Sequence, residues 1–343
     1  MEGLIIGVDL GGTQTRAALV DREGNILHRT SYLTLAQEGM EAVMSRIKGA
    51  IHEVMDSADR GAIRGIGVAA PGPLDPWKGV ILEAPNLPGW ENVPLKDLLE
   101  EEFGLPVYVG NDANLAALAE QRFGVGRGVA DLIYITVSTG IGGGIIVDNR
   151  LLLGAHGLAG EVGHQTLEAN GPRCKCGNVG CLEVLAAGPA IARSAIQLIK
   201  TGVVTKISDL VDGDLDKITA KVVSQAAQAG DPVAVELFRQ AGFYIGVGIV
   251  NLLHLFNPSL IIIGGGVAKA GALLFEPIRA TVRERAMTSR YWENTPIVPA
   301  ALGDDVGLLG AVALVLMQEE ETNTSSSSEF SQVQRNLGGL RGT

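Results

Sequence analysis

The chain has 343 residues, and single domains run to roughly 100 to 200 residues, so we expect two domains with a cleft between them. With 46% hydrophobic residues, 19% charged residues and a mean hydropathy of +0.25, the composition excludes a disordered chain. A net charge of −11 without any basic run excludes a nucleic-acid surface, because neutralising phosphates takes clustered Lys and Arg.

The N-terminal sequence predicts a cytoplasmic protein. An apolar run, residues 4–8, begins almost at once, with no basic segment or small-residue cleavage site, so we expect no signal peptide. The apolar stretch at 245–256 contains His254 and several glycines and is too short to cross a bilayer, so we expect no membrane contact.

The first half of the chain alternates predicted strands and helices. Glycines at 11 and 12 separate the first two strands and form what we call the first glycine hairpin, residues 9–14. The predicted strands are 4–10, 15–20, 26–32, 65–70 and 107–110, and the predicted helices are 39–56, 93–103 and 111–123. This alternation is typical of α/β architecture.

A similar order of predicted strands and turns recurs further along the chain. An apolar strand at 132–137 leads into a glycine-rich turn, and strands at 145–147 and 151–153 follow; we call residues 138–144 the second glycine hairpin. Because both copies place a glycine-rich turn between hairpin strands, we infer an internal duplication.

The C-terminal half is mostly helical. Helices are expected at 190–201, within 218–255 and at 306–317, and a strand at 260–263 runs into a triple glycine, 264–266. Residues 319–343 are rich in serine and lack apolar periodicity, so we expect a disordered tail. The expected domains are 1–115 plus about 305–318, with the first hairpin, and 116–304, with the second.

Three cysteines and one histidine predict a structural zinc site. His164, Cys174, Cys176 and Cys181 use every cysteine in the chain, and one imidazole with three thiolates forms a closed tetrahedral shell for Zn²⁺. Four ligands leave no open position, so the metal would fix a loop and not activate water. The alternative is three incidental thiols beside an unrelated histidine.

The glycine hairpins are candidate phosphate sites, because glycine allows backbone N–H groups to approach a phosphate closely. Asp9 would orient Mg²⁺ through water, a role suited to a carboxylate. Two such hairpins from a duplicated fold could clamp one triphosphate, whereas each alone could be a plain turn. The residues expected to bind the nucleotide are Asp9, Gly11, Gly12, Thr13, Gln14, Ser138, Thr139, Gly140, Gly142, Gly265 and Gly266.

Asp112 is the candidate general base. Asn111 and Asp112 lie between a buried strand and a helix start, and phosphoryl transfer to a hydroxyl needs a proton acceptor. The alternative is an ordinary helix N-cap. Glu161, Glu183 and Asn86 could accept hydrogen bonds from sugar hydroxyls; the alternatives are surface glutamates and a turn asparagine.

At these residues the chain resembles the ROK family (repressor, open reading frame, kinase) of the actin, Hsp70 and hexokinase superfamily. The resemblance runs from Asp9 to about Met317 and is most specific in the block from Cys174 to Glu183. It implies a duplicated actin-like ATPase fold and a sugar kinase that uses ATP, Mg²⁺ and structural Zn²⁺, similar to the bacterial ATP-dependent glucokinases that serve glycolysis.

The resemblance also implies the roles of individual residues. Asp112 falls on the catalytic base, and His164 falls on a residue that binds both sugar and zinc. Gln14 stands where many members have Lys, which removes a positive charge near the phosphates. The residues that fall on the sugar site are Asn86, Asn111, Asp112, Glu161, His164 and Glu183.

Several alternatives stay open from sequence alone. Kinases for N-acetylmannosamine, N-acetylglucosamine, fructose or allose share these motifs, and polyphosphate could replace ATP. Some family members are DNA-binding repressors, but here the segment that carries the first hairpin begins near Gly7, so we expect no winged helix before it. A sugar sensor without catalysis is less well supported because Asp112 is present. A homodimer or homotetramer is expected by resemblance.

Overall fold

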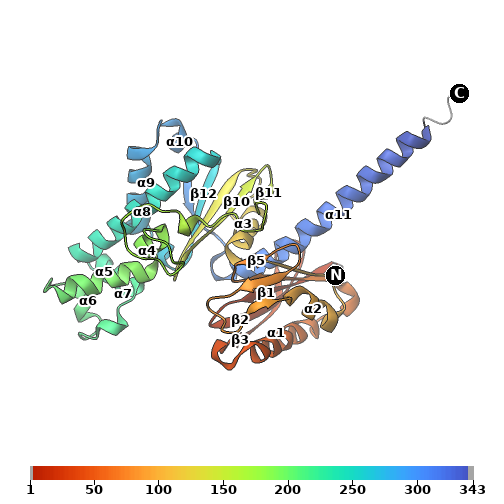
Figure 1. Ribbon diagram of the computed structural model, residues 1–343, viewed down its shortest axis with the longest axis horizontal. Helices are drawn as coiled ribbons and strands as arrows, with labels where there is room; N and C mark the ends of the chain where they lie inside the picture. The colour runs from red at the N-terminus through yellow and green to blue at the C-terminus, as the bar shows by residue number, and fades with distance from the viewer. Residues whose placement is uncertain (1–2, 339–343) are drawn as a thin grey trace. The chain divides into compact units, whose positions relative to one another are not determined.

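The computed structural model describes residues 3–338, and the chain divides into two compact units (Figure 1). Unit 1 comprises Met1–Ala119 and Asp304–Thr343, and unit 2 comprises Glu120–Gly303. The boundaries expected from sequence lie close by, at 115/116 and about 304/305. The N-terminal and C-terminal ends of the chain therefore belong to the same unit.

Unit 1 is built on a five-stranded sheet with the order β3-β2-β1-β4-β8. The first three strands form an antiparallel meander, and β4 and β8 run parallel to β1. The strands are β1 (Leu4–Leu10), β2 (Gln14–Val20), β3 (Ile26–Leu33), β4 (Ile63–Ala70) and β8 (Val107–Asn111), with a small sheet of β5 (Leu74–Asp75), β6 (Val80–Glu83) and β7 (Glu91–Val93). The helices are α1 (Met40–Met55), α2 (Leu95–Phe103), α11 (Val306–Gly338) and α3 (Asp112–Arg122), whose last residues belong to unit 2.

The sheet of unit 1 allows α11 to approach its backbone closely. A Cβ at Gly7 would lie 2.5 Å from the carbonyl oxygen of Leu308, and a Cβ at Gly67 would lie 1.9 Å from that of Ala311. Only glycine fits such contacts without a shift of the helix. Because alternate strand residues share a face, Asp9 follows Gly7 onto the same face of β1.

The helix α11 is longer than the sequence analysis expects. It begins at Val306, as predicted for 306–317, and continues to Gly338, where a disordered tail is expected from 319. Glutamates at 319–321 are good helix formers and no proline interrupts the segment, which accounts for the continuation. The rest of the expected tail, residues 339–343, lies outside the described residues.

Unit 2 repeats the strand order of unit 1. Its five strands are ordered β11-β10-β9-β12-β13, with an antiparallel meander followed by two strands parallel to β9. They are β9 (Leu132–Val137), β10 (Ile141–Val147), β11 (Arg150–Leu151), β12 (Leu260–Gly264) and β13 (Ile297–Pro299). This repetition confirms the predicted internal duplication, in which each glycine hairpin joins the first two strands of one sheet.

The helices of unit 2 include one that is long and apolar. They are α4 (Leu182–Ala186), α5 (Gly188–Lys200), α6 (Lys206–Asp209), α7 (Ala220–Gln228), α8 (Pro232–Phe256), α9 (Ala272–Arg285) and α10 (Arg290–Glu293). Contrary to the expectation from residues 245–256, α8 is long and apolar enough to cross a membrane by length and composition, because its first half is apolar too. In unit 2, 56% of its apolar window is buried, and it packs against α4, α5, α7 and α9, which is typical of a core helix.

A buried carboxylate joins two distant segments of unit 2. Glu120 is 0% exposed, and its Oε1 accepts hydrogen bonds from the backbone N–H groups of Ala301 (2.8 Å) and Leu302 (3.0 Å). Its Oε2 accepts a third, from Val125 (3.0 Å). A buried charge persists only where such partners compensate its lost hydration. Glu120 therefore ties the end of α3 to the segment that follows β13.

We predict that Glu120→Ala destabilises the protein, because it leaves three backbone donors without a partner. At about 1 kcal/mol or more for each unsatisfied donor, the loss is at least about 3 kcal/mol. That corresponds to a fall in Tm of about 6 to 12 °C, measurable by thermal unfolding. Glu120→Gln keeps one acceptor oxygen and is expected to lose about half as much. A Tm unchanged in the Ala variant would contradict this role.

Candidate active site

The first glycine hairpin is held by main-chain contacts and packs against a loop asparagine. Gly11 donates its N–H to the carbonyl of Gln14 (2.9 Å), and the hydroxyl of Thr34 donates to the carbonyl of Gly11 (2.6 Å). A Cβ at Gly12 would lie 3.1 Å from the Cβ of Asn86. Unit 1 therefore brings Asn86, expected from sequence to hold the sugar, next to the hairpin expected to hold phosphate.

Asn111 and Asp112 stand where β8 ends and α3 begins. Asn111 Oδ1 accepts the N–H groups of Ala113 (3.0 Å) and Asn114 (3.2 Å), so Asn111 does cap the helix. Asp112 Oδ1 also accepts the N–H of Ala113 (2.7 Å), and the Asp112 side chain is exposed. Asn111 is therefore the N-cap of α3, as the alternative interpretation proposed. The Asp112 side chain lies at the surface of unit 1, at the start of the same helix.

The second glycine hairpin is fixed from two sides. The carbonyl of Ser138 accepts the N–H of Gly188 (2.9 Å) at the start of α5. On the other side, the N–H of Ile141 donates to Oε2 of Glu183 (2.9 Å), which also lies over Gly140, where a Cβ would come within 2.5 Å. A carboxylate predicted to hold sugar therefore contacts the hairpin predicted to hold phosphate.

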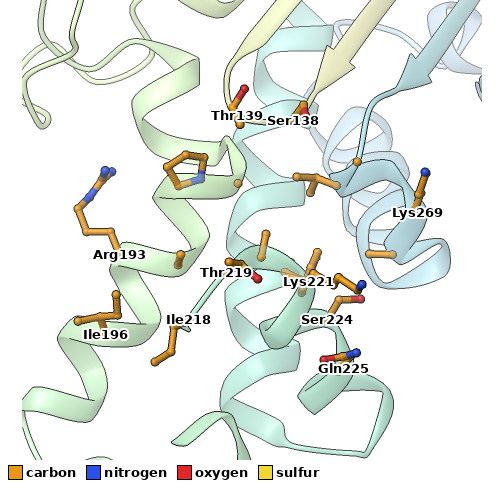
Figure 2. A pocket seen from close by; sticks show the side chains of 18 of the residues that line it. Ser138, Thr139, Arg193, Ile196, Ile218, Thr219, Lys221, Ser224, Gln225 and Lys269 are labelled. Carbon is orange, nitrogen blue, oxygen red and sulfur yellow. The ribbon is translucent and has the colours of Figure 1, made fainter. Parts of the chain in front are cut away.

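A cavity of about 930 Å³ opens at the tip of this hairpin (Figure 2). Ser138 and Thr139 line it at the end of the strands, and Gly266, from the triple glycine after β12, lines it at one side. Most of the remaining wall comes from α5, α7 and the turn after β12. These wall residues include Gly188, Ala192, Arg193, Ile196, Thr219, Ala220, Lys221, Ser224, Gln225, Val267, Lys269 and Ala270.

The shape and chemistry of this cavity suit a nucleoside. A largely apolar wall with a few polar groups is typical of small-molecule sites, and a base would lie against it while phosphates face the hairpin. Gly265 permits the close packing at its edge: a Cβ there would lie 2.4 Å from the carbonyl oxygen of Val137. Gly142 lies further along, within β10 and beside the hairpin tip.

The four predicted metal ligands come together in unit 2. The ligand atoms of His164, Cys174, Cys176 and Cys181 all lie within 4.8 Å of one another. The Sγ atoms of Cys176 and Cys181 are 3.7 Å apart, and Nδ1 of His164 is 3.9 Å from Sγ of Cys174. A tetrahedral shell with Zn–S bonds of about 2.3 Å has sulfur–sulfur edges of about 3.8 Å, so the donor set fits Zn²⁺.

The loop that carries these ligands, residues 164–181, folds back on itself through several main-chain hydrogen bonds. Cys174 donates its N–H to the carbonyl of Asn178 (2.8 Å), and Gly180 donates to that of Pro172 (2.8 Å). We call residues 164–181 the cysteine loop. Gly180 has φ +65°, and a Cβ there would lie 1.7 Å from the carbonyl oxygen of Glu168, so only glycine fits.

The thiols of the cluster differ in their environments. Burial, with its neighbouring thiols, raises the pKa of Cys181 to about 12, whereas the backbone N–H of Asn178 lowers the pKa of Cys176. Because a metal binds thiolate, zinc would have to displace the proton of Cys181 on binding. The cluster without metal is thus expected to be protonated at Cys181 at neutral pH.

His164 presents its two ring nitrogens to different groups. Nδ1 lies on the side of Cys174, and Nε2 lies 4.0 Å from Oε2 of Glu161. A metal on Nδ1 would hold the imidazole plane and leave Nε2 beside Glu161. One histidine can therefore serve both the cluster and a hydroxyl-binding site, as the resemblance implies.

Structure brings together some expected residues and adds others that sequence did not indicate. Unit 1 places Asn86 beside Gly12, and unit 2 places Glu183 beside Gly140 and His164 beside the cysteines. The sequence did not indicate the residues of α5 and α7 that line the cavity, because small and aliphatic residues on amphipathic helices are also typical of a core. Thr13 and Gln14 lie in the first hairpin and are exposed.

We predict that Cys176→Ala removes a stoichiometric zinc from the purified protein and lowers its Tm. In zinc-binding peptides such a metal contributes about 10 to 16 kcal/mol of folding free energy, so the cysteine loop should lose its order. Lys175→Ala, an exposed neighbour without a ligand atom, is the control and should keep both properties. Elemental analysis that finds no zinc in the unaltered protein would refute the site.

The chain is similar to known proteins over almost its whole length. The glucokinase of Thermotoga maritima is 38% identical over 314 residues, which cover 91% of this chain and 96% of the relative. A crystal structure of a ROK family glucokinase from Streptomyces griseus in complex with glucose and AMPPNP is 40% identical, with a TM-score of 0.79, and covers 91% of this chain and 99% of that one.

Regulators of the same family are similar as well. The xylose repressor of Caldicellulosiruptor bescii is 35% identical over 316 residues, which cover 92% of this chain and 78% of the repressor. Residues 5–318 match the ROK family, and with the repeated sheet and the Cys₃His cluster this confirms the resemblance seen in the sequence. The chain belongs to the ROK family.

Proposed function

We propose that this protein is an ATP-dependent sugar kinase that converts D-glucose and ATP to D-glucose 6-phosphate and ADP. The observation that carries the proposal is the cavity at the tip of the second glycine hairpin, lined by Ser138, Thr139 and Gly266. It supplies a nucleoside-sized space next to backbone donors for phosphate. The glucokinases described above, one of them bound to glucose and an ATP analogue, support the choice of substrates.

The nucleotide is proposed to bind with its base against the cavity wall and its phosphates toward the glycine turns. Gly140 in the second hairpin and Gly11 and Gly12 in the first allow backbone donors to face the phosphate oxygens. Asp9 would hold Mg²⁺ through water, and the ion would neutralise charge on the phosphates during transfer. An apolar wall of this size favours a nucleoside triphosphate over polyphosphate, which has no base to bury.

Asp112 is proposed as the general base. Its carboxylate accepts the proton of the sugar 6-hydroxyl while that oxygen forms a bond to the γ-phosphorus and the bond to the leaving oxygen of ADP breaks. A carboxylate on an exposed helix end is accessible to a substrate hydroxyl, and α3 fixes its position. Asn111, which caps that helix, would hold the same sugar.

The sugar is proposed to be held by hydrogen bonds from polar side chains. Asn86 and Asn111 would contribute amides, and Glu161, His164 and Glu183 would contribute a carboxylate, an imidazole and a second carboxylate. Structural zinc in the cysteine loop would keep His164 in place. We further propose that the enzyme acts in the cytoplasm, where ATP and glucose are available, and as a homodimer or homotetramer.

A coupled ADP-release assay against a panel of hexoses tests this proposal, and Asp112→Ala tests its mechanism. We predict turnover with glucose above N-acetylmannosamine, N-acetylglucosamine, fructose and allose. In Asp112→Ala, kcat should fall by about two or more orders of magnitude with ATP binding nearly unchanged, since the change removes the proton acceptor only.

The alternatives give different results in the same assay. A kinase for another hexose would show its highest kcat/KM with that sugar. A regulator related to the xylose repressor would bind a sugar without releasing ADP. Comparable turnover in Asp112→Ala would overturn the assignment of the base.

A further inference from the structure

Arg16 pairs with the carboxylate of Asp9 across the first two strands. The register of β1 and β2 places the two residues directly opposite each other. Nε of Arg16 donates to Oδ2 of Asp9 at 3.1 Å, and Nη2 donates to the same oxygen. Both hydrogen bonds described for this carboxylate therefore go to Oδ2.

The guanidinium of Arg16 is anchored on its other side as well. Its Nη1 donates to the backbone carbonyl of Asp304 at 2.7 Å, just before α11 begins. The side chains of Arg16 and Asp9 are 26% and 19% exposed, so the pair is partly shielded from water. A guanidinium bound at three nitrogens has little freedom left, and it transmits that restriction to the carboxylate.

The carboxylate of Asp9 also lies against the first turn of α11. A Cβ at Gly307 would lie 2.6 Å from Cγ of Asp9 and 2.8 Å from each of its oxygens. The absence of a side chain at Gly307 is thus what makes room for the carboxylate. The positive end of the helix dipole favours an anion at this place.

We propose that Arg16 is a positioning residue for the metal of the metal–nucleotide complex: it holds Oδ2 of Asp9 and leaves Oδ1 to face the ion or its water. This inference rests on the metal role of Asp9 given under the proposed function. Because Asp304 anchors Arg16 independently, the guanidinium can stay in place when the metal binds. Arg16 is the only basic residue in the segment from Leu4 to Val20, so no neighbour in these strands replaces it.

The test measures Mn²⁺ binding to the full-length protein with ADP present, by electron paramagnetic resonance of free Mn²⁺. Removing a partner that orients a metal-binding carboxylate typically weakens metal affinity about 10-fold to 100-fold, and we expect Arg16→Gln to do so. Arg29→Gln is the matched control. Arg29 pairs with Asp305 (2.9 Å), next to Asp304, and has no described contact with Asp9, so its loss should leave Mn²⁺ affinity unchanged.

The outcomes separate this inference from the proposed function. Unchanged or tighter Mn²⁺ binding in Arg16→Gln overturns the inference, and tighter binding would mean that Arg16 competes with the metal. If Asp9→Asn weakens binding while Arg16→Gln does not, the metal role of Asp9 stands and only the role of Arg16 fails. If neither variant weakens it, both fail.

Arg16→Lys covers the case in which Arg16→Gln does not fold. It keeps the positive charge and loses the planar set of donors, so a several-fold weaker Mn²⁺ affinity is expected. Unchanged affinity in a folded Arg16→Lys protein would overturn the inference too.

Discussion

A single hydrogen bond, from the N–H of Ile141 to Oε2 of Glu183, links the parts of unit 2 that bear on function. Glu183 stands in the first turn of α4, two residues after the N-cap residue Cys181, which is a ligand of the predicted metal site. Ile141 begins β10 at the second glycine hairpin. The metal cluster, the proposed sugar site and the proposed phosphate site therefore share one chain of contacts.

The second glycine hairpin and the cysteine loop are held in place by different contacts. The second hairpin is anchored by its sheet and by Gly188, and Glu183 holds its tip at Gly140 and Ile141. The cysteine loop has several main-chain hydrogen bonds of its own, and its four ligand atoms meet at one point, where a metal would add to them. A metal in a closed four-ligand shell has no open position at which to bind a substrate or activate water. Its proposed value is to hold His164 and the start of α4 still, and with them Glu183.

Features with a strong local cause were predictable from the sequence. The strand 4–10 is observed as β1, because a short, nearly continuous run of buried aliphatic residues followed by a glycine pair is typical of a buried strand. The cysteines could be assigned together because the chain has no others and His164 precedes them closely. The predicted duplication placed each glycine hairpin between the first two strands of its sheet.

Features that depend on long-range contact were not predictable. The pairing of Asp9 with Arg16 needs the strand register, and the position of its carboxylate needs α11, which is encoded some three hundred residues later. The cavity wall on α5 and α7 consists of residues such as Ala192 and Ile196, which fit a core equally well. Buried Glu120 has no sequence signal, because its partners are backbone N–H groups.

Glu183 is proposed to support the second glycine hairpin besides binding sugar. Titration calorimetry of AMPPNP with sugar-free protein tests this directly, comparing Glu183→Ala with Glu161→Ala, since both carboxylates are assigned to the sugar but only Glu183 bonds to Ile141. A hydrogen bond to a charged group contributes about 1.5 to 3 kcal/mol, so nucleotide affinity should fall about tenfold or more in Glu183→Ala and stay unchanged in Glu161→Ala. Equal nucleotide affinity in the two variants would contradict this role of Glu183.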